Sequence, residues 1–287
     1  MFLNRGLWRV FHGVETSDGA DVKLTRIIGS PDLNMLDPFL LLDCFESDDV
    51  KDYIGGFPAH PHRGFETATY LLNGRMRHKD NAGHEGVIEA GGVQWMTAAK
   101  GIIHSEMPEQ EKGLLRGFQL WVNLPAAQKM NQPAYQEYSP ATTPLEQREN
   151  GTLIKVIAGE TSMGTKGPIK NNTILPIFMD LQLPPHTHWQ QELPGEHNGF
   201  LYVIGGSLDV LSEGHKEREP TEMLQQKSLG VLTRGENLNI LSGEEGARFL
   251  LIAGQPINEP VVRSGPFVMN TRKEILQAYQ DFQNGKL

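Results

Sequence analysis

Cysteine is nearly absent from this chain of 287 residues, in which Cys44 is the single copy. One cysteine excludes an internal disulfide and is typical of a protein from a reducing compartment. The sequence also lacks an apolar run of membrane-spanning length, and its first ten residues lack the apolar core of a signal peptide. We therefore expect a soluble, cytoplasmic protein with no membrane partner, which in a eukaryotic cell would also be nuclear.

Basic side chains are outnumbered and scattered. The chain has 26 Lys and Arg against 35 Asp and Glu, which gives a formal net charge of −9, and no stretch concentrates the basic residues. Proteins that bind nucleic acid hold its phosphates mainly with clustered Lys and Arg. The composition therefore argues against direct binding of nucleic acid.

Glycine and proline are plentiful, with 31 and 18 copies, as expected for many short strands joined by tight turns. The clearest strand is 117–124, where apolar and polar side chains alternate. Asn73-Gly74 predicts a hairpin because both residues tolerate positive φ. The pattern predicts an all-β fold, with further strands at 7–13, 22–28, 39–42, 66–72, 75–79, 87–89, 93–98, 153–158, 174–183, 199–211, 229–233, 238–242 and 248–253.

A polar, proline-bearing stretch at 125–150 shows no apolar periodicity and separates two groups of strands. We predict an N-terminal domain at 1–130 that binds metal, a linker at 131–150, and a C-terminal domain without metal at 151–287. The chain should end in a helix capped by Asn270 or Thr271. Its apolar face would consist of Ile275, Leu276, Tyr279 and Phe282.

Two short segments of the N-terminal domain each carry a pair of metal-capable side chains. His60 and His62 are two residues apart, as are His104 and Glu106. Side chains at this spacing point to the same face of a strand. Two such pairs facing each other would place three imidazoles and one carboxylate around a point, a set that suits a divalent first-row transition metal, iron(II) first.

Other interpretations of these residues stay open. Glu66, four residues after His62, competes with Glu106 as the carboxylate ligand and otherwise orients a ligand imidazole. A structural zinc site is a further alternative, although such sites are closed and often rich in Cys. His186 and His188 repeat the spacing in the second half without a second pair, and we expect them to be surface or structural residues.

The remaining histidines lie in or beside polar turns or exposed strands by pattern. We expect all of them to be solvated, although two, His78 and His84, flank a hairpin that could approach the mouth of the metal cavity. The set is His12, His78, His84, His197 and His215.

The motifs resemble those of the pirin family, a branch of the cupin superfamily with two tandem cupin barrels. The resemblance covers essentially the whole chain. It is carried by the run from Phe57 to Thr67, by Gln94-Trp95-Met96-Thr97-Ala98, by the run from Gly101 to Glu106, and by Gly265-Pro266-Phe267-Val268 before the terminal helix.

The resemblance implies a metal site as well as a fold. In pirins the metal is iron, held in the N-terminal barrel by both histidines of the first motif and by the histidine and glutamate of the second. In this sequence these are His60, His62, His104 and Glu106, with one Fe(II) per chain and other divalent transition metals as substitutes.

The resemblance implies two classes of function. Some pirins act as quercetin 2,3-dioxygenases, which open the central ring of a flavonol with dioxygen and release carbon monoxide. Glu106 would then be the catalytic base that takes the proton of the 3-hydroxyl. The alternative is an iron-dependent redox-sensing regulator, which binds a transcription factor or a metabolic enzyme without turnover. We expect Phe57, Phe65, Trp95, Met96 and Met107 to form either an apolar cavity wall or plain core.

Overall fold

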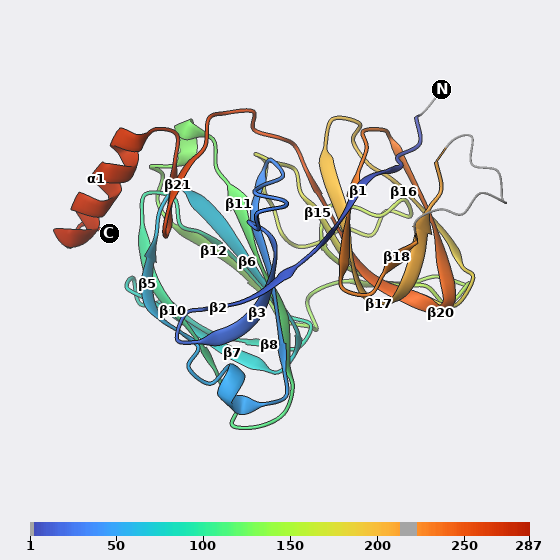
Figure 1. Ribbon diagram of the computed structural model, residues 1–287, viewed down its shortest axis with the longest axis horizontal. Helices are drawn as coiled ribbons and strands as arrows, with labels where there is room; N and C mark the ends of the chain where they lie inside the picture. Colours follow the sequence, from blue (N-terminus) through green and yellow to red (C-terminus); the bar gives the residue numbers. More distant parts are fainter. Residues whose placement is uncertain (1–2, 213–222) are drawn as a thin grey trace. The chain divides into compact units, whose positions relative to one another are not determined.

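The computed structural model describes residues 3–212 and 223–287, and the chain forms two compact units (Figure 1). The first barrel consists of Val14–Ala141 with Ile257–Leu287, and the second barrel consists of Met1–Gly13 with Thr142–Pro256. The predicted all-β class with a C-terminal helix is confirmed. No helix in the described part of the chain is long and apolar enough to cross a membrane.

Two antiparallel sheets build the first barrel. The larger has seven strands in the order β12-β9-β6-β11-β4-β3-β2, and the smaller has four in the order β5-β10-β7-β8. Two short 3-10 helices, Val50–Asp52 and Ala126–Gln128, lie in loops. The strands are β2 Val14–Asp18, β3 Val22–Ile28, β4 Phe39–Ser47, β5 Phe57–His62, β6 Phe65–Asn73, β7 Arg75–Asp80, β8 Glu85–Glu89, β9 Val93–Thr97, β10 Ile102–Pro108, β11 Leu115–Asn123 and β12 Ala134–Tyr138.

The facing sides of these two sheets pack against each other through a buried apolar cluster. Leu24, Phe45 and Leu71 come from the larger sheet, and Met76 and Ile88 come from the smaller one. Burial of such side chains stabilises each by about 1.5–3 kcal/mol. The cluster therefore joins the two sheets of the first barrel.

The second barrel is one nine-stranded sheet in the order β1-β19-β17-β20-β15-β14-β13, with β16 on β20 and β18 on β17. The register between β17 and β20 shifts on either side of Gly206. Gly206 and Gly246 are at positive φ, and a Cβ on Gly206 would lie 2.1 Å from the carbonyl oxygen of Gly246, so this close approach requires glycine. The strands are β1 Leu7–His12, β13 Leu145–Gln147, β14 Leu153–Ala158, β15 Ile177–Leu183, β16 His188–Glu192, β17 Asn198–Val210, β18 Leu224–Gln225, β19 Ser228–Leu232 and β20 Asn237–Gly254.

The inside of the second barrel is filled by apolar side chains. Trp189 and Phe249 pack at its centre with their ring centroids 6.2 Å apart, and buried Leu, Ile and Val side chains surround them. A core packed in this way leaves little room for a polar site.

The C-terminal segment lies on the first barrel. The strands β21 (Val262–Ser264) and β22 (Phe267–Met269) pair, and the helix α1 (Arg272–Gln283) packs on them through Ile275 and Ala278 (Figure 1). Of the two predicted caps, Thr271 is the one used, since its hydroxyl accepts from the backbone N–H of Glu274 at 3.3 Å.

Three sequence expectations differ from the structure. The stretch 131–150 is no structureless linker, because β12 pairs with β9 and β13 pairs with β14, so each barrel takes one edge strand from it. Asn73-Gly74 turns the chain between sheets instead of forming a hairpin, since β6 and β7 belong to different sheets. The compact units are also not the contiguous halves that the sequence suggested, because residues 1–13 belong to the second barrel and residues 257–287 belong to the first.

Candidate metal centre

The register between β5 and β10 places the histidines together. His104 lies opposite His60, and Ile102 lies opposite His62. A register shift follows, so that Glu106 lies opposite Phe57, with one extra residue on the β5 side. Pro58 and Pro61 suit β5 because it is the edge strand of the smaller sheet.

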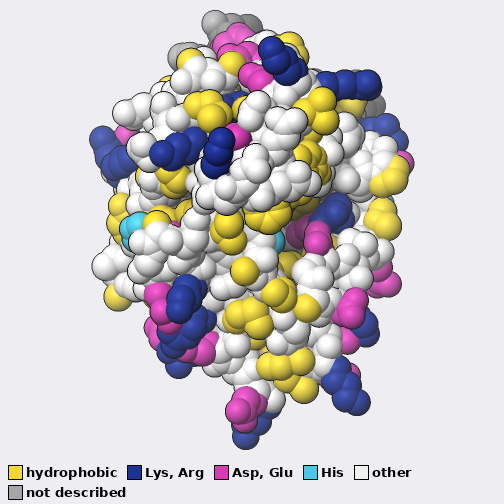
Figure 2. Space-filling view, turned by 90° about the vertical axis from the view of Figure 1, so that its left-hand side faces the viewer, with side chains coloured by type: hydrophobic (Ala, Val, Ile, Leu, Met, Phe, Trp, Pro, Cys, Tyr) yellow, Lys and Arg dark blue, Asp and Glu magenta, His cyan; other side chains and the backbone are white. Residues whose placement is uncertain are grey.

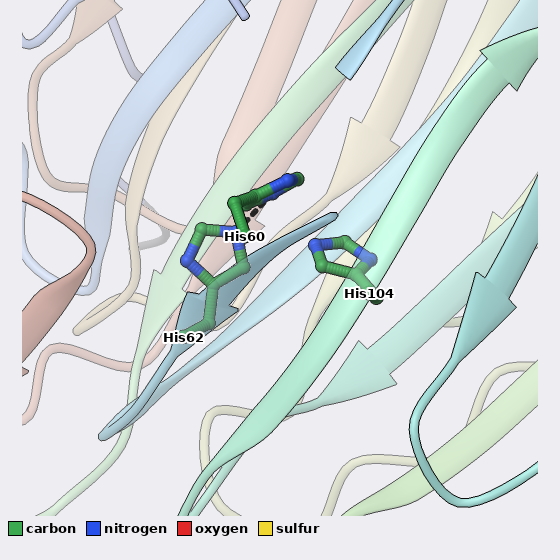
Figure 3. A group of neighbouring side chains, drawn as sticks. All are labelled: His60, His62 and His104. Carbon is green, nitrogen blue, oxygen red and sulfur yellow. Dashed lines mark hydrogen bonds between the residues drawn. The ribbon is translucent and has the colours of Figure 1, made fainter. Parts of the chain in front are cut away.

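Three imidazoles converge in this part of the barrel (Figure 3). One ligand-capable nitrogen from each of His60, His62 and His104 lies within 4.8 Å of the others. Within residues 3–212 and 223–287 this is the one such group of three or more His, Cys, Asp and Glu. His62 and His104 are 3% and 2% exposed, whereas His60 is half-buried.

The Nδ1 atom of each ring is held by a partner outside the group. His60 Nδ1 lies 2.8 Å from the Pro58 carbonyl oxygen, His62 Nδ1 lies 3.4 Å from that of Pro266, and His104 Nδ1 lies 3.4 Å from His78 Nδ1. Such contacts fix the orientation of a ring and leave Nε2 for a ligand.

The Nε2 atoms fit a shared cation. Those of His60 and His62 lie 3.0 Å apart, and His104 Nε2 is buried with no hydrogen-bond partner among the described residues. A buried nitrogen without a partner costs about 1–3 kcal/mol. A metal ion at this point would satisfy all three atoms.

Burial keeps the deeper rings uncharged. Desolvation, with the nearby His60, lowers the pKa of His62 to about 3. Desolvation, with the neighbouring His62, His60 and His78, also holds the pKa of His104 well below its ordinary value of 6.5. Neutral imidazole is the form that binds metals, so both rings are ready to bind near neutral pH.

The two candidate carboxylates lie in different surroundings. Glu106 is buried beside the histidines, where its carboxylate accepts a hydrogen bond from Thr69 Oγ1 at 2.9 Å and one from Gln119 Nε2 at 3.4 Å. It lines the same cavity as His60 and His62 but is not part of the tight group. Glu66 is also buried, does not line this cavity, and accepts from Thr97 Oγ1 at 2.7 Å.

A cavity of about 670 Å³ adjoins the histidines. Arg26 holds Asp43 through two hydrogen bonds of 2.9 and 2.7 Å on its wall, and the Arg263 guanidinium lies 5.0 Å from the centre of a Trp121 ring. The volume is in the range of small-molecule sites. Its lining is Asp18, Gly19, Leu24, Arg26, Leu41, Asp43, Phe45, Phe57, Pro58, His60, His62, Met76, Glu106, Gln119, Trp121, Arg263, Gly265 and Pro266.

Sequence reasoning missed several members of this environment. Of the five expected wall residues, Phe57 lines the cavity, while Trp95 and Met96 are buried away from it. His78 is 1% exposed, so its expected solvation is wrong. The alternation of β7 could have indicated this, because His78 shares its face with the buried Met76.

The other histidines follow the expectation in part. His12, His84, His186 and His188 are exposed. His197 is 3% exposed, and its expected solvation is also wrong. His215 lies outside the described residues.

The fold and the histidine cluster define this chain as a two-domain cupin protein with a candidate metal site. The family model "Pirin" matches residues 21–122, and the model "Pirin C-terminal cupin domain" matches residues 178–287. The chain belongs to the pirin family, as its resemblance predicted.

Close relatives and solved structures agree with this assignment. A pirin-like protein of Caulobacter vibrioides is 49% identical over 98% of this chain and 99% of its own. A Pseudomonas aeruginosa protein named "Putative quercetin 2,3-dioxygenase" is 47% identical over 99% and 98%. The crystal structure of a quercetin 2,3-dioxygenase from Acinetobacter baumannii superposes with a TM-score of 0.87 and 33% identity, covering 99% of this chain and 98% of that one.

Proposed function

We propose that the first barrel holds one divalent transition-metal ion through His60, His62, His104 and Glu106, and that the metal is iron(II). Three neutral imidazoles and a carboxylate are a donor set that first-row metals accept. The convergence of three imidazoles beside a cavity, with the Nε2 atoms of His60 and His62 3.0 Å apart, is the observation that carries this proposal.

The activity that we propose is ring opening of a flavonol-like substrate with dioxygen, of the quercetin 2,3-dioxygenase type. Two findings support it. Relatives with near full-length matches carry this name, and the cavity has both the volume and the mixed aromatic and polar lining that a flat polyphenol needs. The single cysteine, which is buried, also supports the proposed cytoplasmic location.

The chain's own residues would bind and deprotonate this substrate. When bound, the metal would supply Lewis acidity and a template for the adjacent 3-hydroxyl and 4-carbonyl oxygens. Glu106, buried at the same place, would accept the proton of the 3-hydroxyl. Thr69 and Gln119 would orient the Glu106 carboxylate from the opposite sheet, and Trp121 would flank the aromatic rings.

Anaerobic loading with iron(II), followed by quercetin and air, tests this function. We expect loss of the flavonol absorbance together with release of carbon monoxide, at one bound metal per chain. A protein that binds iron but leaves quercetin intact would contradict the enzymatic proposal. Redox-dependent binding of a protein partner by that same protein would instead favour the regulator that the sequence left open.

A further inference from the structure

Two arginine side chains lie next to each other on one wall of the cavity. Arg26 comes from β3 and Arg263 from β21, and both line the cavity. A Cβ added to Gly29 would lie 3.4 Å from Arg263 Nη1 and 3.7 Å from Arg26 Cδ, so both side chains lie beside the same glycine. Figure 2 shows acidic and basic side chains directly beside a histidine near the middle of one face of the molecule. We call Asp18, Arg26, Asp43 and Arg263 the charged wall of the cavity.

The two arginines differ in their partners. Arg26 donates to Asp43 at 2.9 and 2.7 Å and to Asp18 at 2.9 Å, so carboxylates surround its charge. Arg263 donates one hydrogen bond, to the Leu40 carbonyl oxygen at 3.2 Å, and no carboxylate oxygen of the described residues lies within 4.0 Å of its side-chain nitrogens. A guanidinium has five N–H donors, and the Arg263 side chain is exposed. Arg263 therefore has donors to offer to a molecule in the cavity.

Trp121 connects Arg263 with the histidine cluster. The Arg263 Cζ atom lies 5.0 Å from the centre of a Trp121 ring, and the His62 ring centroid lies 5.1 Å from that of Trp121. Pro266, three residues after Arg263, also contacts His62, because its carbonyl oxygen lies 3.4 Å from His62 Nδ1. A flat aromatic molecule that reaches the histidines along Trp121 therefore brings its other end to the charged wall.

The charged wall suits a neutral hydroxyl group better than an anion. The formal charges of its two arginines and two aspartates cancel, so an added negative charge would meet repulsion as well as attraction. A hydroxyl can accept from Arg263 and donate to Asp18, since it has both a proton and lone pairs. Two hydroxyls on neighbouring carbons match the planar fork of one guanidinium, whose N–H groups can bind two oxygens side by side.

We propose that Arg263 is a specificity-determining residue, which binds the two neighbouring hydroxyl groups on the pendant ring of a flavonol. The proposal rests on the proposed function, because it takes the chelating oxygens of the same molecule to lie at the histidines. In quercetin the pendant ring carries such a pair, whereas the hydroxyls of the fused ring are one carbon further apart. Arg263 thus decides which flavonols bind, without touching the bond that reacts.

Binding without turnover tests this assignment. Galangin is quercetin without the two hydroxyls of the pendant ring, so the pair of ligands isolates their contribution. In protein loaded with iron(II) under nitrogen, absorbance titration should show quercetin bound about 10-fold more tightly than galangin, as expected for a hydrogen bond to a charged group. Arg263→Gln should remove this preference by weakening the binding of quercetin alone, and the retained affinity for galangin shows that the variant is folded. Arg263→Lys should recover only part of the preference, because an ammonium group lacks the fork.

Arg9→Gln is the matched control. Arg9 is also exposed and lies over an aromatic ring, 4.9 Å from the centroid of Phe11, but it does not line the cavity. This variant should keep the full preference for quercetin.

The outcomes separate this proposal from the proposed function. Equal weakening of both flavonols in Arg263→Gln would show a structural role and overturn the proposal, as would equal affinities of the unmodified protein for the two. An unmodified protein that binds neither flavonol would overturn the proposed function and this proposal together. Binding with the expected preference but without turnover in air would overturn the proposed enzymatic activity alone and would support the assignment of Arg263.

Discussion

His104 lies directly across the β5–β10 ladder from His60, and their imidazole centroids are 4.4 Å apart. This pairing joins two sequence motifs that are far apart in the chain. It depends on backbone register, because a slip of one residue would turn one pair of side chains to the opposite face of the sheet. The pairing of β5 with β10 in the smaller sheet therefore fixes the position of these histidines.

Exchange of Glu106 for Gln tests the choice of carboxylate. We expect the variant to bind metal at least about 10-fold more weakly, since loss of even an outer partner costs that much, and to lose turnover of quercetin. Glu66→Gln is the matched control and should retain both properties. Metal titration and a flavonol assay measure the two effects, and the opposite pattern would transfer the ligand role to Glu66.

The second barrel should bind no metal. His186 and His188 are exposed at its rim, and its inside is filled by Trp189 and its neighbours. Changing both histidines to Ala should leave the stoichiometry at about one ion per chain in elemental analysis, given the one donor set found among the described residues. Changing His60 and His62 together should abolish binding. A fall in stoichiometry in the first double variant would show a second site.

Lys129 should stabilise the first barrel through hydrogen bonds to uncharged acceptors. Its buried Nζ donates to the carbonyl oxygens of Gly64 and Val268 and to Asn123 Oδ1, at 2.6 to 3.0 Å. Lys129→Met leaves these acceptors unpaired and should lower the free energy of unfolding by about 2–4 kcal/mol. Denaturant titration measures the change. Lys112→Met, at an exposed position, should change it little, and similar losses in both variants would contradict this role.

The stability of the second barrel should fall in mild acid because of His197. Burial, with the nearby Arg5 cation, lowers the pKa of His197 from 6.5 to about 4. Between these values the unfolded chain binds a proton that the folded chain does not, so stability rises with pH and is lost as pH falls from 6.5 towards 4.

Exchange of His197 for Phe should remove this contribution. The slope of unfolding free energy against pH should decrease by up to about 1.4 kcal/mol per pH unit within that window. Urea unfolding of the metal-free protein at several pH values measures the slope. His12→Phe replaces an exposed histidine of the same barrel and should leave the slope unchanged. An unchanged slope in the His197 variant would contradict the assignment.

Local sequence patterns predicted the parts of the fold that depend on local chemistry. The alternation in 117–124 and the spacing of the His60/His62 and His104/Glu106 pairs are signals of period two, and strands formed at all three places. The terminal helix is likewise predicted by its cap, but its expected apolar face is only partly right, because Ile275 is buried while Leu276 and Phe282 are exposed.

Features that depend on distant partners were not predictable in this way. The stretch at 131–150 reads as polar loop because β12 is an edge strand whose side chains are largely polar, and its pairing with β9 is visible only in three dimensions. Burial of His78 likewise depends on Tyr135, which lies on that same edge strand. The sequence predicted the three clustered histidines but not the residues that orient them.

Residues 257–287 pack on the barrel built from Val14–Ala141. Arg63, beside the first histidine motif, pairs with Asp281 at 2.8 Å, and Lys129 reaches the Val268 carbonyl. During synthesis residues 257–287 must therefore leave the ribosome before the barrel with the histidines can gain these supports. The barrel whose first strands are made early is completed only after the strands of the second barrel have been made.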